Sequence, residues 1–284
     1  MSDIKKVVVL GTGVLGSQIA FQSAYAGFRV TAYDVDDAAL ARAEERFAGL
    51  AKTYLAEVPG ADEAATAAAL ANLSYSADLA QAVDDADLVI EAVPEILELK
   101  RTTYRKLGAV APQKTIFATN SSTLLPSDIV DATGRPDRFL AMHFANQIWR
   151  ANTAEIMGTT LTSPAVFDTV VQYAQQMGMV PIPIHKEKAG YVLNSLLVPF
   201  LGAALELAAG EYAAPEDVDK TWRIATGSPL GPFQFYDIIG MNTPYNIMAG
   251  GDADAQKLAA WLKKNYIDQG KLGIASGEGF YKYS

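Results

Sequence analysis

The sequence contains no cysteine and only two histidines, His143 and His185, among its 284 residues. Without cysteine the chain can form no disulfide, no thiolate metal site and no cysteine nucleophile. We expect no bound metal. Histidine is the side chain that titrates near neutral pH, so the two histidines are the first candidates for a residue that transfers a proton.

Positive charge is also scarce. The chain has 23 basic and 32 acidic residues, a formal net charge of -9. Nucleic acids and anionic membrane surfaces bind basic faces, so we expect neither as a partner. The longest apolar run, 196–209, is too short to span a bilayer and contains Glu206. The first residues, MSDIKKVVVL, lack the apolar core of a secretory signal, and we expect a cytoplasmic protein.

Apolar strand-like segments alternate with helical stretches through the first two thirds of the chain. The expected strands are 6–10, 28–34, 87–93, 115–120, 139–144, 154–158 and 180–184. This alternation predicts βαβ units and a parallel sheet. Beyond residue 186 only helical periodicity recurs. The sequence therefore predicts a Rossmann-type α/β domain over 1–186 and an all-α domain for substrate and dimer contacts over 187–284.

The stretch LGTGVLG has the spacing of a dinucleotide-binding loop, with Gly11, Gly13 and Gly16 between a buried strand and a helix. These glycines permit a tight turn, close approach of a pyrophosphate and close helix packing. Asp34 ends the next strand, where a carboxylate accepts hydrogen bonds from ribose hydroxyls. With Asp36 and Asp37 nearby and no arginine to receive a 2′-phosphate, the loop predicts NAD(H) rather than NADP(H).

Oxidation of an alcohol by NAD also needs a base for the hydroxyl proton. His143 lies at the end of an apolar strand, on the side of the sheet where open α/β folds bind ligands. His185 lies among charged residues at the domain junction, and we expect it to be solvated. A histidine in an apolar strand is often only a satisfied core residue, so the assignment of His143 depends on its neighbours.

Three polar residues are candidate neighbours of His143. Glu155 interrupts the next apolar strand and needs a partner, either His143 or, alternatively, Arg150. Ser122 belongs to the short polar loop TNSST, which could otherwise cap the following helix. Asn194 interrupts an apolar helix at the domain junction, where it could bind a ligand or simply link helices.

Together these segments resemble the 3-hydroxyacyl-CoA dehydrogenases, through LGTGVLG, DADLVIEAVPE, ATNSST, MHFAN, AEIM, KAGYVLNSLL, SPLGPFQFYDIIG and GEGFYKY. The resemblance implies a helical second domain that forms a homodimer. It assigns His143 as the base and Glu155 as its partner, with Ser122 and Asn194 as substrate contacts. It also implies that four residues lie near the cofactor: Glu95, Lys100, Ser122 and Asn146.

The sequence departs from that family in three places. The family usually reads HFFNP where this chain reads HFANQ, and Ala275 stands where a lysine is common. The segment 34–87 contains twelve acids and three bases, whereas members that use CoA have a lysine-bearing tract there. The chain is therefore most similar to the diketoreductases of this family, which reduce 3,5-dioxo esters with NADH.

Other functions compete with this interpretation. A 3-hydroxyacyl-CoA dehydrogenase of fatty-acid metabolism would use a CoA thioester, and a sugar-acid dehydrogenase would oxidise a 3-hydroxy acid. Some crystallins related to this family bind NAD without catalysis. The joint presence of Ser122, His143, Glu155 and Asn194 argues against a non-catalytic protein. A small 3-oxo or 3-hydroxy compound remains the expected substrate.

Overall fold

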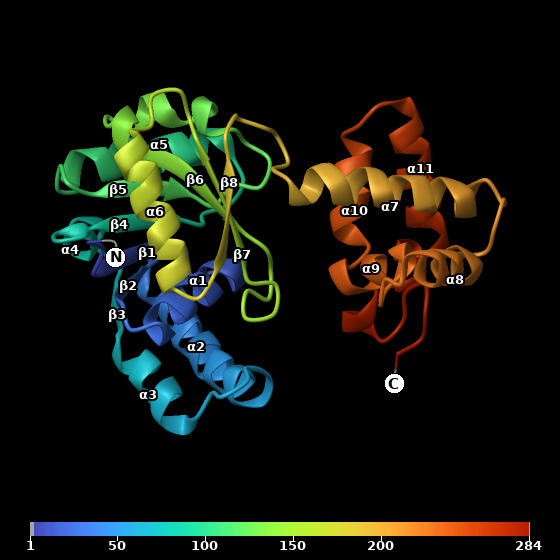
Figure 1. The fold of residues 1–284 in the computed structure, drawn as a ribbon, viewed down its shortest axis with the longest axis horizontal. Helices are drawn as coiled ribbons and strands as arrows, with labels where there is room; N and C mark the ends of the chain where they lie inside the picture. Colours follow the sequence, from blue (N-terminus) through green and yellow to red (C-terminus); the bar gives the residue numbers. More distant parts are fainter. Residues whose placement is uncertain (1–2, 284) are drawn as a thin grey trace. The chain divides into compact units, whose positions relative to one another are not determined.

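The computed structural model describes residues 3–283, which fold into two compact units divided between Val192 and Leu193. The expected boundary near residue 186 lies a few residues before this division. Figure 1 shows the first unit as a sheet with helices on both faces and the second as a group of helices. The predicted fold class, a Rossmann-type α/β domain followed by a helical domain, is confirmed.

The first unit is built on eight strands in the order β3-β2-β1-β4-β5-β6-β7-β8. The strands are β1 (Lys6–Leu10), β2 (Arg29–Tyr33), β3 (Leu73–Ser76), β4 (Leu88–Glu91), β5 (Ile116–Thr119), β6 (Phe139–Phe144), β7 (Thr153–Gly158) and β8 (Val180–Ile184). Neighbours are parallel except β6 and β7, which pair antiparallel through a short loop. The expectation of a fully parallel sheet was therefore wrong at this pair.

Helices cover both faces of this sheet. They are α1 (Val14–Tyr25), α2 (Asp37–Glu57), α3 (Glu63–Ala71), α4 (Leu79–Val83), α5 (Leu97–Val110) and α6 (Pro164–Gln176), with three short 3-10 turns within 126–138. On β1, Val7 and Val9 enter the core under α1, α2 and α6, whereas Val8 and Leu10 enter the core under α4 and α5. A strand buried on both faces explains the continuous run KVVVL.

The second unit contains five α-helices: α7 (Leu193–Ala209), α8 (Pro215–Thr226), α9 (Pro232–Ile239), α10 (Asn242–Ala249) and α11 (Ala253–Asn265). Leu205, Phe233 and Leu262 lie in its core. Its last segment is fastened to the helices by Asp237, whose carboxylate accepts hydrogen bonds from the Phe280 and Tyr281 amides. No helix in the described range 3–283 is both long and apolar enough to cross a membrane.

Candidate active site

The glycine loop between β1 and α1 leaves room for a phosphate at one position. Gly11 has a φ of +92°, and a Cβ there would lie 2.7 Å from the Ala92 carbonyl oxygen. A Cβ on Gly16 would lie 1.9 Å from the Gly11 carbonyl oxygen. A Cβ on Gly13 would meet no atom within 4 Å, and Gly13 caps α1 without any side-chain hydrogen bond. The open space at this helix N-terminus fits the pyrophosphate of NAD.

Asp34 is held at the end of β2 by the same loop. Its Oδ2 accepts hydrogen bonds from the Thr12 amide (2.8 Å) and the Thr12 hydroxyl (2.6 Å), and its Oδ1 accepts from the Val35 amide (2.8 Å). Partial burial by itself raises the pKa of Asp34, but these hydrogen bonds and the charge of Arg42 lower it below its usual value. Asp34 is therefore ionised at neutral pH and suited to accept from ribose hydroxyls.

The structure corrects the expectation that no arginine lies near this carboxylate. Arg42 contributes to the lowered pKa of Asp34, and the Arg46 guanidinium donates to the Thr12 carbonyl oxygen at 3.1 Å. Both arginines come from the second and third turns of α2, which begins at Asp37, just after Asp34. The two arginines follow Asp34 by eight and twelve residues, and the sequence alone does not show that α2 brings them back to the glycine loop.

A cavity of about 500 Å³ opens beside the loop, within the size range of small-molecule sites. Gly11 and Gly13 line one side of it, and Asp34 lies on its wall. Leu79 and Leu99 supply apolar surface that suits the adenine ring. The residues present therefore fit a bound dinucleotide.

His143 and Glu155 face each other across the antiparallel pair of β6 and β7. The Nδ1 of His143 lies 2.9 Å from Glu155 Oε2, and both side chains are about 95% buried. Because a carboxylate only accepts, Nδ1 must carry a proton, which leaves Nε2 free to act as the reacting nitrogen. Ser122 Oγ lies 3.1 Å from that Nε2. Of the two partners considered for Glu155, the structure selects His143; Arg150 pairs with Glu57.

Tyr191 completes the support of the imidazole and was not predicted. Its ring stacks on His143 with centroids 4.5 Å apart, and its hydroxyl donates to the Ser121 carbonyl oxygen at 2.7 Å. The adjacent Val192 amide donates to Glu155 Oε1 at 2.8 Å. These contacts restrict the imidazole and the carboxylate to one arrangement. Nothing in the segment KAGYVLN indicated that its tyrosine would reach back to this strand.

A buried ionic network holds the loop that carries Ser122. Lys100 Nζ lies 2.6 Å from Glu91 Oε1 and 3.3 Å from Glu95 Oε2. Glu95 Oε1 in turn accepts from the Ser122 amide at 3.0 Å and the Thr123 amide at 2.8 Å. Burial alone raises the pKa of Glu95, but the hydrogen bonds from this loop and the Lys100 charge lower it to about 2.

The network gives Lys100 a second role beside the expected one. Its side chain is 1% exposed and its ammonium lies against two carboxylates and the Val93 carbonyl oxygen, so through Glu95 it supports the Ser122 loop. Glu91 in DLVIEAV was not identified from the sequence, although a carboxylate in a buried strand requires a partner for the same reason as Glu155. Its other oxygen accepts from the Thr119 hydroxyl at 2.7 Å.

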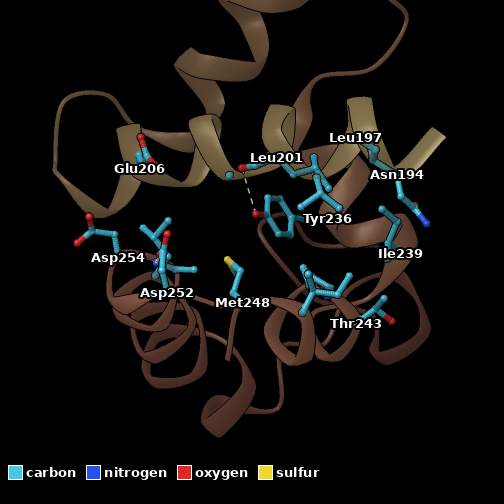
Figure 2. Close-up of a pocket in the computed structure, with 16 residues that line it drawn as sticks. Asn194, Leu197, Leu201, Glu206, Tyr236, Ile239, Thr243, Met248, Asp252 and Asp254 are labelled. Atoms are coloured by element: carbon cyan, nitrogen blue, oxygen red, sulfur yellow. Dashed lines mark hydrogen bonds between the residues drawn. The ribbon is translucent and has the colours of Figure 1, made fainter. Parts of the chain in front are cut away.

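The remaining predicted residues lie in different places. Asn146 is exposed on the loop after β6 and is hydrogen-bonded to Gln18 of α1. His185 is exposed at the end of β8. Asn194 belongs to the helical unit, where it lies on the rim of a cavity of about 440 Å³ between α7 and α10. Figure 2 shows Asn194 at one end of this cavity and Glu206 and Asp254 toward the other.

The first unit therefore brings Ser122, His143 and Glu155 into contact and joins Glu95 and Lys100 to them. The role of Asn194 toward a substrate stays a prediction. Within residues 3–283 no group of three or more metal-ligating side chains is present. The arrangement provides a buried acid/base with one free nitrogen, a hydroxyl beside it, and a dinucleotide loop on the same sheet.

Comparison with known proteins places this site in context. The model of the 3-hydroxyacyl-CoA dehydrogenase NAD binding domain matches residues 6–188, and that of the C-terminal domain of the same enzymes matches 190–283. The chain is 35% identical to mitochondrial hydroxyacyl-coenzyme A dehydrogenase of Rattus norvegicus, with 99% of this chain and 91% of that protein covered. It is 33% identical to a probable 3-hydroxybutyryl-CoA dehydrogenase of Bacillus subtilis, with 99% and 98% covered.

Two solved structures are similar over nearly their full length. One is described as substrate-directed dual catalysis of dicarbonyl compounds by diketoreductase; it is 62% identical, with a TM-score of 0.98 and 100% of both chains covered. The other is (S)-3-hydroxybutyryl-CoA dehydrogenase from Ralstonia eutropha, 28% identical, with a TM-score of 0.87 and 99% and 100% covered.

Proposed function

The chain belongs to the 3-hydroxyacyl-CoA dehydrogenase family, and we propose that it is a diketoreductase-like member that reduces uncharged 3-oxo and 3,5-dioxo esters with NADH. Its general activity is NAD-dependent oxidoreduction between 3-hydroxyacyl and 3-oxoacyl groups. The observation that supports the narrower substrate class is the 62% identity to a diketoreductase over both entire chains, against 35% to a CoA-using relative.

The charge of the segment 34–87 supports the same choice. Its twelve acids outnumber its three bases, Arg42, Arg46 and Lys52. Arg46 is engaged with the Thr12 carbonyl oxygen, and Glu57 at the end of α2 is paired with Arg150. A nucleotide tail with several phosphates needs basic groups at its binding surface, and this segment supplies charge of the wrong sign.

Several residues of the first unit prepare the site for NADH. The open space at Gly13 and the N-terminus of α1 would hold the pyrophosphate, and Asp34 would accept hydrogen bonds from the adenosine ribose. Bound NADH supplies the hydride that goes to the ketone carbon. Burial of His143 and Glu155 keeps water away from the reacting pair, which strengthens the hydrogen bonds between them.

His143 supplies the proton in the reductive direction. Protonated at Nε2, it donates to the ketone oxygen as negative charge develops there, and in the oxidative direction the neutral ring accepts the hydroxyl proton at the same nitrogen. Glu155, at 2.9 Å from Nδ1, stabilises the imidazolium and fixes the orientation of the ring. The Ser122 hydroxyl, 3.1 Å from Nε2, is placed to donate a second hydrogen bond to the substrate oxygen.

A CoA thioester is the second candidate substrate, because the curated relatives that match the whole chain carry that name. The test is NADH oxidation with acetoacetyl-CoA, an acetoacetate ester and a 3,5-dioxo ester under one set of conditions. We expect kcat/KM for the uncharged esters to equal or exceed that for acetoacetyl-CoA. A tenfold or larger preference for acetoacetyl-CoA would make the protein an ordinary 3-hydroxyacyl-CoA dehydrogenase.

Ala145 offers a sharper variant of that assay. It follows β6 two residues after His143, is half-buried, and stands where the family usually has phenylalanine. Ala145→Phe should lower kcat/KM for bulky esters selectively, by about tenfold, because added ring volume in a packed site excludes the larger group. A methyl acetoacetate control should change little. Equal losses for both esters would remove residue 145 from the substrate site.

We also propose that the helical unit forms a homodimer. Of the twenty exposed large apolar side chains among the described residues, ten lie in this shorter unit, including Leu196, Ile224 and Ile247. Val198, one of these ten, also lines the cavity between α7 and α10, where the buried Met248 lies as well (Figure 2). Exposed apolar surface of this extent is typical of protein interfaces. Sedimentation at twice the chain mass of 30.3 kDa would support the dimer.

The location of the protein in the cytoplasm stays a prediction.

A further inference from the structure

The loop between β6 and β7, residues 145–152, joins the strand of His143 to the strand of Glu155 and contains a strained residue. Gln147 has a φ of 58°, a left-handed conformation that residues with a side chain seldom adopt. Its carbonyl oxygen accepts from the amides of Arg150 (2.8 Å) and Ala151 (2.9 Å). Strained backbone of this kind concentrates at functional sites, where surrounding contacts hold it in place.

Gln18 provides those contacts from the helix that follows the glycine loop. Its side chain is 5% exposed, and its Oε1 accepts from the amides of Gln147 (2.8 Å) and Ile148 (3.3 Å). Its Nε2 donates to Asn146 Oδ1 at 2.7 Å. Two successive backbone amides can converge on one acceptor here because the left-handed turn at Gln147 brings them to the same side.

These hydrogen bonds fix the orientation of the Asn146 side chain. Its Oδ1 accepts from Gln18 and also from the Gln147 amide at 3.0 Å, so the direction of the carboxamide is determined. Its Nδ2 has no hydrogen-bond partner among residues 3–283, and the residue is exposed. The loop therefore presents two N–H donors, rather than a carbonyl oxygen, on the stretch that follows the catalytic strand.

The rest of the loop is fixed independently of Gln18. Ile148 is fully buried in the core of the first unit. Glu57 of α2 accepts from the Trp149 indole at 2.5 Å and pairs with Arg150 Nε at 2.9 Å. Removal of one hydrogen bond at Gln18 should thus leave the loop in place and change only the orientation of Asn146.

We propose that Gln18 is a positioning residue that turns the Asn146 amide so that its N–H groups face a carbonyl oxygen of the bound reactants. The left-handed backbone of Gln147 is what allows Gln18 to do this. The oxygen belongs either to the ketone substrate or to the carboxamide of the cofactor, and the two share the same chemistry. The inference rests on the proposed active site around His143. It connects the loop 145–152 to α1, the helix that follows the glycine loop.

Gln18→Glu separates this role from a structural one. Glutamate keeps the length of the side chain and one oxygen for the Gln147 and Ile148 amides, but it cannot donate to Asn146 Oδ1. The Asn146 amide must then flip, donating Nδ2 to the new carboxylate and presenting its oxygen to the reactants. Replacing a donor by an acceptor should lower kcat/KM for ketone reduction by at least roughly tenfold.

The readout assigns the oxygen. A raised KM for the ketone with unchanged NADH affinity, measured by fluorescence titration, identifies the substrate as the ligand of Asn146. A weakened NADH affinity identifies the cofactor. Wild-type kinetics and wild-type NADH affinity in Gln18→Glu would overturn the proposal, provided that the thermal midpoint shows a folded protein.

Gln147→Pro and Gln147→Gly form the matched pair for the backbone. Glycine adopts a positive φ freely and keeps the amide, so Gln147→Gly should retain wild-type kinetics. The family usually has proline at this position, but proline fixes φ near −65° and has no N–H to donate to Gln18, so in the loop of this chain Gln147→Pro should lower kcat/KM for ketone reduction, whereas Gln147→Gly should not. Equal kinetics of the two variants would overturn the role of the left-handed turn.

Failure of this inference is distinguishable from failure of the proposed function. The variants are compared with the wild type on whichever ketone the wild type reduces best, ester or thioester. If the wild type reduces no 3-oxo compound, or if His143→Ala retains full turnover, the proposed function fails. If the wild type reduces a 3-oxo compound, His143→Ala loses turnover, and Gln18→Glu keeps wild-type kinetics and NADH affinity, only the positioning role of Gln18 fails.

Discussion

The two units of this protein bury carboxylates in opposite ways. In the first unit, Glu91 and Glu155 are each paired with a base, Lys100 at 2.6 Å and His143 at 2.9 Å. In the helical unit, Asp219 and Asp237 are equally buried but accept from backbone amides and from the hydroxyls of Tyr281 and Tyr283. One arrangement pairs a carboxylate with an imidazole or an ammonium, and the other surrounds it with N–H and O–H donors only.

The difference indicates a catalytic role for the buried carboxylate of the first unit and a structural role for those of the helical unit. In the proposed reaction the pair in the first unit changes its protonation state, because the Glu155 charge can compensate that of an imidazolium. Asp237 instead joins the C-terminal segment to α9, where Gly279 approaches so closely that a Cβ would lie 2.0 Å from the carboxylate. A buried charge satisfied only by N–H and O–H donors serves to fix one backbone arrangement.

Removal of the imidazole should have the largest effect of any single change. His143→Ala should lower kcat by about 10²–10⁴, because general acid–base catalysis contributes that much. NADH affinity and the thermal midpoint should stay close to wild type. The exposed His185 gives the control, and a larger loss of turnover in His185→Ala than in His143→Ala would contradict the assignment.

Asp237→Asn should damage stability rather than chemistry. An amide in place of the carboxylate points N–H groups at donors from Phe280, Tyr281 or Tyr283, and each lost hydrogen bond to a charged group costs about 1.5–3 kcal/mol. Denaturant unfolding should show a lower free energy of unfolding, while kcat of the remaining folded enzyme should hold. Asp254→Asn, at an exposed surface pair, should leave the unfolding midpoint unchanged.

Cofactor choice depends on a single ionised carboxylate. NADH should be preferred over NADPH by at least about 2 kcal/mol, roughly 30-fold in kcat/KM, because Asp34 repels a 2′-phosphate. With Arg42 and Arg46 already near Asp34, the Asp34→Ala variant should narrow that gap without an added arginine. Equal kcat/KM for the two cofactors in the wild type would refute the preference.

The sequence was informative wherever a local pattern had one physical explanation. The glycine loop and the strand KVVVL correctly predicted the fold. The unfavourable position of Glu155 in an apolar strand correctly predicted its contact with His143. Tyr191 and Gln18 could not be predicted in this way, because their contacts join segments 70 and about 130 residues apart. Strand β3 was missed since LSYS has only one buried position and no apolar run.

The antiparallel step at β6 and β7 had the same kind of cause. Both strands are apolar and mostly buried, so their composition does not distinguish parallel from antiparallel pairing. Only the loop of 145–152 between them, too short for a crossover helix, carried that information. The same loop brings Glu155 opposite His143, so the antiparallel pairing and the proposed catalytic pair have one origin.

The pH dependence of Glu155→Gln tests the comparison of the two units most directly. Glutamine keeps the shape of the side chain but removes the charge that stabilises a protonated His143. In the reductive direction the imidazolium is the active form, so the fall in kcat at high pH should begin at lower pH in the variant than in the wild type. An alkaline limb of kcat that coincides with the wild type would contradict the account.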